Sequence, residues 1–280
     1  MSRTKKTSGG SSPVKKYLSF SGSTGKVKYY DKNHKDADEK GNVSLDRVDL
    51  ILLDIKSSVS GYNEKTSSGV SSNLLDPYSV GKEEFIIKTK QDGKYGEVLR
   101  GIWKDIKNEA DAFGGKFTTN LFALADFGSG YELVRLELNG AGLSPWIEFV
   151  DGLDNDDEIY DKLVTISKGQ LCTRKKGKTE PVSEAEYKKV IAELKKDPMA
   201  TKPVWFYIPS IATIDLTEEQ VDLAVEQDEV LQAYFDSTGN NQGQEVSEKN
   251  DDPFEGASVN NTSPKPAEGT TEEDDDDLPF

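Results

Sequence analysis

The composition of the chain changes after Asp236, and this change limits which residues can fold. From Ser237 to Phe280 the sequence is mostly Ser, Thr, Asn, Gln, Gly, Pro and acids, and few positions are strongly apolar. Such a segment cannot bury enough apolar surface to offset the entropy lost on ordering. We therefore expect a disordered acidic tail over residues 237–280, a folded body over 17–236 and a flexible basic arm over 1–16.

The net charge is unevenly distributed along the chain. There are 35 basic and 51 acidic residues, for a formal charge of −16, and the tail holds 12 of the acids against two lysines. The body is therefore only mildly acidic on average. A nucleic-acid surface on it would have to come from local clusters of basic residues.

Cysteine content and hydropathy indicate the class of protein and its compartment. The single cysteine, Cys172, excludes an internal disulfide framework and is typical of a reducing cytoplasm. No apolar run approaches the length of a membrane span, and the N-terminus lacks the apolar stretch of a signal peptide. We expect a cytoplasmic protein with no membrane partner.

Within the body, stretches of alternating hydrophobicity are interrupted by stretches of helical spacing. Strands are expected at Lys26–Tyr30, Val48–Ile55, Phe85–Ile87, Phe117–Ala125, Tyr131–Leu138, Trp146–Val150, Leu163–Ile166 and Val204–Ile208. Helices are expected from Val98 to Phe113 and after two capping boxes, Ser183 with Glu186 and Thr217 with Gln220. Residues 57–72 are interpreted as a mobile loop and 151–158 as an acidic loop. This order favours a mainly β or α+β fold, an elaborated barrel with added helices.

Several strands combine rings with basic residues, which is the chemistry that single-stranded nucleic acid requires. Binding without sequence preference needs cations along the phosphate backbone and exposed rings on which bases stack. Rings fall opposite the apolar face at Tyr131 with Arg135, at Trp146, and at Trp205 with Tyr207. Basic residues gather at Lys26 and Lys28 beside Tyr30, at Lys88 and Lys90, and at Arg174, Lys175, Lys176 and Lys178. The alternative is that helices cover this second face and make the rings ordinary core. The combination favours a binding groove.

Other groups of residues give only weak indications of a nucleotide, metal or catalytic site. Residues 22–26 look like a phosphate-binding loop, but the glycine spacing is too short for a P-loop and Val27 stands where Ser or Thr is needed. The acidic loop does not follow EF-hand spacing. His34 is the only histidine, which excludes histidine-based triads and His-rich zinc sites. We expect no metal, no cofactor and no enzymatic activity.

The last seven residues place four acids before an apolar tripeptide. Phe280 carries both a ring and the terminal carboxylate, and Pro279 restricts the backbone, which lowers the entropic cost of docking into a pocket. The preceding carboxylates would steer such a tip toward a basic rim. The sequence Asp274-Asp275-Asp276-Asp277-Leu278-Pro279-Phe280 resembles the acidic tip of bacterial single-stranded DNA-binding proteins, which end in a run of Asp and then Ile/Leu-Pro-Phe.

This resemblance implies an OB-fold-like body that binds single-stranded DNA and a tip that recruits replication, recombination and repair proteins. The body is about twice the length expected for the bacterial family, and the Gly-rich linker is less pronounced. Only residues 274–280 therefore match the family motif. The size and layout look more like phage-encoded single-stranded DNA-binding proteins, which would act in the cytoplasm of a bacterial host. The sequence leaves the oligomeric state open.

Two other classes of function remain open from the sequence. A metal-dependent nuclease would use acidic pairs such as Asp154 and Asp156. An acidic DNA mimic or adaptor, suggested by the charge of −16, would bind proteins only.

Overall fold

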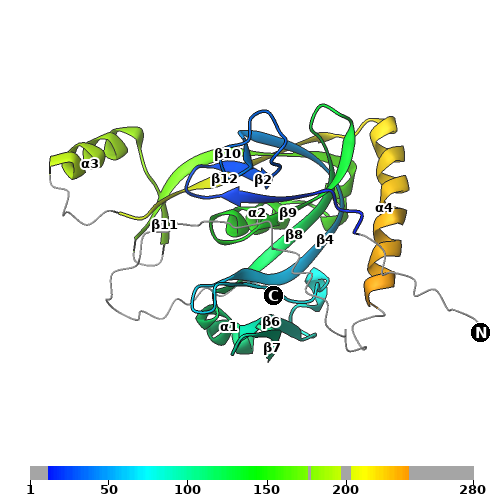
Figure 1. Ribbon diagram of the computed structural model, residues 1–280. Coiled ribbons are helices and arrows are strands. Elements are labelled where there is room, and N and C mark those ends of the chain that lie inside the picture. The colour runs from blue at the N-terminus through cyan, green and yellow to red at the C-terminus, as the bar shows by residue number, and fades with distance from the viewer. Residues whose placement is uncertain (1–11, 176–177, 197–202, 240–280) are drawn as a thin grey trace, which may run out of the picture.

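One long, curled sheet organises the protein, and most of its neighbouring strands are antiparallel (Figure 1). The computed structural model describes residues 12–175, 178–196 and 203–239. Among the described strands, only β1 and β9 pair in parallel. The main path of the sheet is β11 (Lys178–Pro181), β10 (Lys162–Lys175), β4 (Arg47–Asn63), β8 (Gly115–Asp126), β9 (Tyr131–Leu138), β1 (Lys16–Ser21), β2 (Lys26–Tyr30) and β3 (Asn42–Leu45).

Two further strands extend this sheet. β12 (Trp205–Asp215) pairs along β10 on the edge opposite β4 and β11, and β5 (Ser68–Val70) pairs with the end of β4. Beyond β4, strands β10, β11 and β12 continue as a ribbon that projects from the body (Figure 1). The fold is therefore mainly β with helices added, as the sequence predicts, and its sheet is curled into a half-barrel.

The inside of the curl is a packed core. The inward residues of the sheet include Leu50, Leu121, Val134 and Leu136, all without measurable exposure. Helix α2 (Leu143–Asp151) lies inside the curl and buries Trp146, which is 2% exposed, followed by the short 3₁₀ helix η3 (Asp156–Asp161). Burying a ring of this size contributes a few kcal/mol, roughly 1.5–3 on transfer scales. The interior of the half-barrel is therefore filled by the protein itself.

The prediction of a strand at residues 146–150 is wrong, because these residues belong to α2. Five residues with alternating apolar side chains do not distinguish a strand from one face of a helix. The buried pair Leu143 and Trp146 is three residues apart, as on a helix. Pro145 lies in the first turn, where its missing N–H group leaves no hydrogen bond unmade.

Helix α4 (Glu218–Gly239) crosses the outer face of β4, β8 and β9. The predicted capping box is present, since the Thr217 N–H donates to Gln220 Oε1 at 3.0 Å and the Gln220 N–H donates to Thr217 Oγ1 at 3.3 Å. Leu231 of α4 is fully buried in a cluster that contains Leu133. This contact explains why Leu133 interrupts the otherwise polar outward row of β9.

The residues before β1 are attached to the same cluster. Val14 is buried in it, and the Lys15 N–H donates to the Leu133 carbonyl at 2.8 Å. The arm expected over residues 1–16 is therefore held to the sheet by its last residues. Residues 1–11 lie outside the described part of the chain.

A second, smaller apolar cluster joins the ends of β4 and β8 to a separate two-stranded sheet. This sheet contains β6 (Phe85–Gln91) and β7 (Lys94–Gly101), and it packs with helix α1 (Trp103–Ala112) and the 3₁₀ helix η1 (Pro77–Ser79) nearby. The rings of Phe85, Trp103 and Phe117 meet here, with centroids 5.5–6.4 Å apart. Trp103 is thus a core residue, as its helical spacing predicts.

The helix predicted from Val98 to Phe113 begins only at Trp103, because Val98 and Leu99 belong to β7. The chain passes from strand to helix at Gly101. A Cβ at this position would come within 2.5 Å of Ile106 Cγ2, so that a side chain cannot be accommodated without displacement. The missed signal is Asp92-Gly93, a two-residue turn with positive φ at both residues, which is a strong indicator of a β-hairpin.

Two further assignments from the sequence, a loop and the end of a strand, are also wrong. Residues 57–72, predicted as a mobile loop, form the second half of β4 and then β5, with Ser58 and Ser60 buried. Pro209, predicted to end its strand, lies within β12 beside a bulge between Lys168 and Leu171. Proline is tolerated at bulges and on edge strands because the missing N–H is not required there.

Helix α3 (Glu184–Lys196) caps the end of the projecting ribbon (Figure 1). Its predicted N-cap is present, since the Glu186 N–H donates to Ser183 Oγ at 3.1 Å. The apolar stripe predicted to be buried is not, because Tyr187 is exposed and Val190 and Ile191 are only half-buried. The remaining 3₁₀ turn, η2 (Gly140–Gly142), leads from β9 into α2.

Candidate nucleic-acid interface

The outer face of β1 and β2 carries rings and lysines in the order that the alternation predicts. In β2, Val27 and Tyr29 are buried, whereas Lys26 and Lys28 are half-exposed and Tyr30 is exposed. Lys28 pairs with Ser19 of β1, and Tyr17, two residues earlier on the same face, is 51% exposed. These side chains form one accessible surface, which we call the outer row (Tyr17, Lys26, Lys28 and Tyr30).

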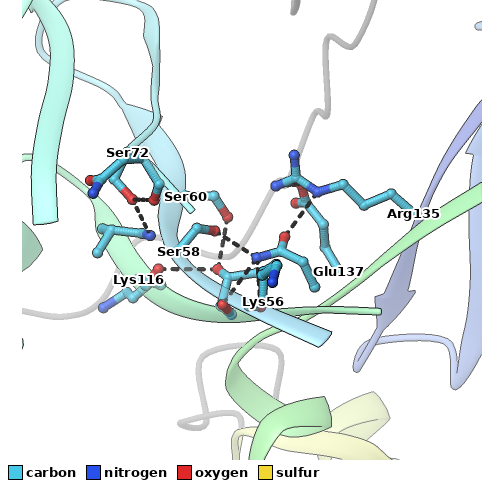
Figure 2. Close-up of polar contacts among 11 residues, drawn as sticks. Lys56, Ser58, Ser60, Ser72, Lys116, Arg135 and Glu137 are labelled. Carbon is cyan, nitrogen blue, oxygen red and sulfur yellow. Dashed lines mark hydrogen bonds and ion pairs between the residues drawn. The ribbon is translucent and has the colours of Figure 1, made fainter. Parts of the chain in front are cut away.

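Arg135 of β9 adjoins the outer row but is heavily engaged. It pairs with Tyr17 in the parallel register between β1 and β9. Its Nη2 lies 2.8 Å from Glu137 Oε1, and its Nε donates to Asn120 Oδ1 at 2.9 Å (Figure 2). The guanidinium also lies over the ring of Phe122, 5.9 Å from the centroid. A phosphate would have to compete with Glu137, so that Arg135 offers less charge than the sequence suggests.

A buried polar network holds Arg135 in place, and the sequence analysis missed it. The Asn120 side chain donates to Ser58 Oγ at 2.9 Å and to the Lys56 carbonyl at 3.1 Å, and Ser60 and Thr118 share a hydrogen bond of 2.8 Å (Figure 2). These hydroxyl and amide groups lie on adjacent strands, β4 and β8. Because each has a partner, the network fixes the register of these strands.

Lys56, at the edge of this network, has a structural role. It forms ion pairs with Asp54 and Asp76 and lies over the ring of Phe235 of α4, 5.4 Å from the centroid. Burial disfavours its charge, but hydrogen bonds to Asp76 and Asp54 outweigh this effect and raise the pKa of Lys56. Its charge is thereby satisfied within the protein.

A second accessible surface lies on the projecting ribbon. Trp205 and Tyr207 are half-exposed on one face of β12, as predicted. The ring of Tyr207 lies beneath Lys168, whose Nζ is 3.8 Å from the centroid, and Trp205 lies 4.8 Å from the ring of Tyr187 of α3. A cavity of about 380 Å³ opens beside Tyr207 and Tyr187. We call Lys168, Trp205 and Tyr207 the ribbon patch.

The side of β12 opposite Trp205 and Tyr207, which the alternation assigns to the core, is not buried: Val204, just before the strand, is 70% exposed, and Phe206 and Ile208 are half-exposed. Here β12 has left the body and runs along the ribbon, so that neither of its faces is fully covered.

The turn between β1 and β2 joins the outer row to the ribbon patch. The Tyr207 N–H donates to the Gly22 carbonyl at 2.7 Å. Gly25 has φ +68°, and a Cβ at this position would come within 2.7 Å of Lys168 Cγ and 3.0 Å of the Tyr207 ring. The glycines that looked like a phosphate loop therefore allow close packing of this turn. Since Lys26 directly follows Gly25, the two accessible surfaces adjoin.

The basic cluster expected around residues 174–178 lies in the hairpin between β10 and β11. Arg174 and Lys178 are exposed, and Lys175 pairs with Lys178 across the hairpin. By register, Lys178 shares a face with Trp205, whereas Arg174 is on the opposite face. Lys176 lies outside the described residues.

Lys88 and Lys90 form a separate group on the β6–β7 sheet. Both are exposed, and Lys90 pairs directly with Tyr95, an exposed ring whose hydroxyl forms a hydrogen bond of 2.7 Å with Ser71. This sheet lies on the other side of β4 from the ribbon (Figure 1), so that these lysines do not extend the outer row. Tyr95 was missed because the hairpin that contains it was missed.

One of the expected ring contacts is lost to the fold, and a second ring remains exposed with its hydroxyl engaged. Trp146 is buried inside the half-barrel and cannot reach a ligand. Tyr131 is 40% exposed, but its hydroxyl accepts a hydrogen bond of 2.9 Å from Gln220 of α4. It lines a cavity of about 480 Å³ together with Arg47 and Phe127, at a distance from the ribbon patch along the sheet.

The weaker constellations involve metal-ligating and thiol side chains. In the described part of the chain, no group of three or more His, Cys, Asp or Glu side chains is arranged to hold a metal ion. Cys172 is buried, and this burial raises the pKa of its thiol, which disfavours the reactive thiolate. No helix in the described ranges has the length and apolar character needed to cross a membrane.

Comparison with protein-family models, with curated proteins and with solved structures finds no match to this chain. The tail residues 240–280, including the tip at 274–280, lie outside the described residues. The chemistry of the site therefore rests on the outer row and the ribbon patch alone.

Proposed function

We propose that this protein binds single-stranded DNA without strong sequence preference, along the outer row and the ribbon patch. The observation that carries the proposal is the junction at Gly25, which packs the turn before β2 against the Lys168–Tyr207 pair; Lys26, the next residue, forms an ion pair with Asp46 at 3.0 Å. Cations would contact the phosphates and the half-exposed rings would stack on bases, and these are the two contributions that such binding requires. The protein would coat and protect single strands during replication, recombination and repair.

The filled interior of the half-barrel favours an elongated ligand on the outside. Trp146 and the buried residues around it fill the middle of the curl. OB-folds likewise use the outer surface of their strands, together with adjoining loops, to bind oligonucleotides. We propose that the half-barrel is an elaborated relative of that plan, with the ribbon as an added binding element.

Stacking favours a single strand over a duplex. The rings of Tyr17, Tyr30 and Tyr207 stand on a sheet surface and can meet bases only where the bases are unpaired. Duplex DNA would present only its phosphates to the same lysines, because its bases are paired. We therefore propose that the two classes of ligand differ in affinity by the stacking contribution.

The acidic tip extends the proposal to protein partners. The resemblance of residues 274–280 to the bacterial tip supports recruitment of replication, recombination and repair proteins in a bacterial cytoplasm, with a phage as the source. In this scheme the protein is a passive binder without enzymatic activity.

An acidic adaptor that binds only proteins is the second candidate. It is favoured by α4, which contains seven acidic and no basic residues and exposes several valines. An adaptor has no need for the paired rings and lysines of the outer row, so DNA binding separates the two functions. A nuclease at Asp154 and Asp156 has no such supporting observation.

An electrophoretic mobility shift with labelled oligo-dT tests the proposal. We expect saturable binding at sub-micromolar protein and low salt, weakened as salt rises because bound phosphates release counterions. Unlabelled duplex DNA and RNA of the same length serve as competitors. Duplex competing as well as oligo-dT would contradict a stacking mode, and absence of any shift would favour the adaptor.

A further inference from the structure

Two helices at opposite ends of the molecule expose apolar side chains in surroundings of opposite charge. Helix α3 caps the far end of the ribbon, whereas α4 lies along the other side of the body (Figure 1). Their separation prevents contact within one chain. Within the described residues, neither surface is covered by another part of the chain.

On α4 the exposed surface is acidic with an apolar centre. Leu231 is turned toward the sheet, while Val221 and Val225, one turn apart, are 40% and 60% exposed. Helical spacing places Glu218, Asp222 and Glu229 beside these valines. α4 contains no basic residue, so that no lysine or arginine on the helix balances these carboxylates.

On α3 the exposed surface has an apolar centre and mixed charge, since the helix contains four lysines and three glutamates. Tyr187 packs on Trp205, while Val190 and Ile191 remain half-exposed in the next turn. Lys189 and Lys195 are exposed on the same short helix. From residue 168 to 196, leaving out 176–177, the ribbon and α3 contain eight basic and four acidic residues. This end of the molecule thus complements α4 in charge.

We propose that α3 of one molecule docks on α4 of the next, so that copies of this chain associate head to tail. Val190 and Ile191 would meet Val221 and Val225, with the lysines of α3 against the carboxylates of α4. Such a contact uses two different surfaces, and it generates an open chain of molecules when the rotation between neighbours does not close a ring. An open chain suits neighbours on a single strand of DNA.

The contact is expected to be weak for free molecules and effective on a shared strand. Exposed ion pairs contribute little individually, and the apolar centre is small. Binding to one strand raises the local concentration of each molecule for its neighbour, which favours association without any new contact. The result would be cooperative coating of long strands. The head-to-tail surfaces themselves do not depend on the proposed DNA contacts.

Charge exchange in the full-length protein tests this proposal. One variant carries Lys189→Glu with Lys195→Glu, and a second carries Asp222→Lys with Glu229→Lys. Each variant alone places like charges on the two docking surfaces. In an equimolar mixture, each altered surface finds its altered complement and each native surface finds its native one. A control with Lys104→Glu and Lys107→Glu on α1 makes the same change in charge elsewhere.

Two measurements are made on each sample, after circular dichroism has established that it is folded. Sedimentation velocity at low salt over a wide concentration range follows association without DNA. Binding to short oligo-dT and to long poly-dT gives cooperativity as the ratio of the two affinities. We expect wild type and control to associate and to bind cooperatively. Each charge variant should lose at least about tenfold in the ratio, equivalent to about 1.4 kcal/mol, and the mixture should regain it.

The outcomes separate this proposal from the proposed function. A mixture that behaves like its separate components, or a control that loses as much as the variants, would overturn head-to-tail docking. A wild type that is monomeric throughout and binds long DNA without cooperativity would overturn it as well. If DNA binding fails while the mixture still associates in sedimentation, the docking stands and the DNA-binding function falls.

Discussion

Lys168 covers one side of the Tyr207 ring, with its Nζ 3.8 Å from the ring centroid. The pair lies where the turn between β1 and β2 meets the ribbon, and the Tyr207 N–H donates to Gly22 in the same place. A positive charge and an accessible ring are thus presented together by backbone elements that are themselves hydrogen-bonded. Substitutions at these two residues can therefore separate stacking from charge.

Removal of the Tyr207 ring should weaken binding to oligo-dT. Tyr207→Ala is expected to cost about 1–3 kcal/mol if a base stacks there, whereas Tyr207→Phe should stay near wild type because it keeps the ring. Fluorescence anisotropy at fixed salt measures the difference. Tyr78→Ala, at the most exposed of the accessible tyrosines, is the control. Equal losses for the Ala and Phe variants would exclude stacking by this ring.

The lysines should appear in the salt dependence of binding. Lys28→Ala combined with Lys168→Ala is expected to reduce the slope of log K against log salt by about 1.4, since each phosphate contact on a single strand contributes about 0.7. Arg135→Ala should change the slope less, because Glu137 already pairs with the guanidinium. Titrations at several salt concentrations measure this, with Lys104→Ala and Lys107→Ala as the charge-matched control. A slope unchanged from wild type would remove these lysines from the interface.

The two tryptophans should respond in opposite ways. Trp146→Ala leaves a cavity inside the half-barrel and is expected to destabilise the protein by about 3–5 kcal/mol, measured as a shift in the urea midpoint. Trp205→Ala is expected to retain most of the stability but to lose affinity for oligo-dT. If Trp205→Ala instead unfolds the protein while its folded fraction binds normally, Trp205 is a structural residue of the ribbon.

Removal of the tail should strengthen DNA binding at low salt. The tail is expected to present its acids to the same basic surface that the DNA uses, at a high local concentration. Truncation after Gly239 keeps α4 complete and removes residues 240–280. The gain in affinity should shrink as salt screens the charges. Binding that is unchanged or weaker at every salt concentration would contradict competition between tail and DNA.

Phe280 should dominate the docking of protein partners. Burial of one ring contributes roughly 1.5–3 kcal/mol, whereas each exposed carboxylate contact adds under about 1 kcal/mol. Deletion of Phe280 removes the ring and moves the terminal carboxylate to Pro279, so that binding to exonuclease, helicase or mediator partners should fall at least about tenfold. Pull-downs from bacterial lysate with the peptide 237–280, with and without Phe280, provide the measurement. Identical bound proteins would reduce the tail to a generic acidic linker.

Local patterns predict several strands and the helix caps of this protein well. β2 and β9 have the bounds that their alternation gives, the capping box of Thr217 with Gln220 forms, and the N-cap at Ser183 is present, because these signals depend on neighbouring residues alone. The mainly β class follows from the same patterns. Lys26, Lys28 and Tyr30 of the outer row were predicted for this reason.

Contacts between residues far apart in the sequence determine the features that local patterns do not predict. Trp146 has the same alternating neighbours whether it lies on a strand or on a helix, and only its place inside the curl makes it core. Ser58 and Ser60 look like loop residues until Thr118 and Asn120 on the neighbouring strand supply their hydrogen bonds. Lys168 was not predicted as a site residue, because the ring that it contacts, Tyr207, lies on another strand and is distant in the sequence.

The half-barrel has a filled inside and, over β1 and β2, an exposed outer face, and the two surfaces constrain the sequence in different ways. Residues such as Leu50 and Leu136 are constrained by volume, and changes there alter folding. Tyr17, Lys28 and Tyr30 take no part in that packing, so they are open to replacement without loss of the fold. Affinity for the ligand could therefore drift, or be engineered, while thermal stability stays constant.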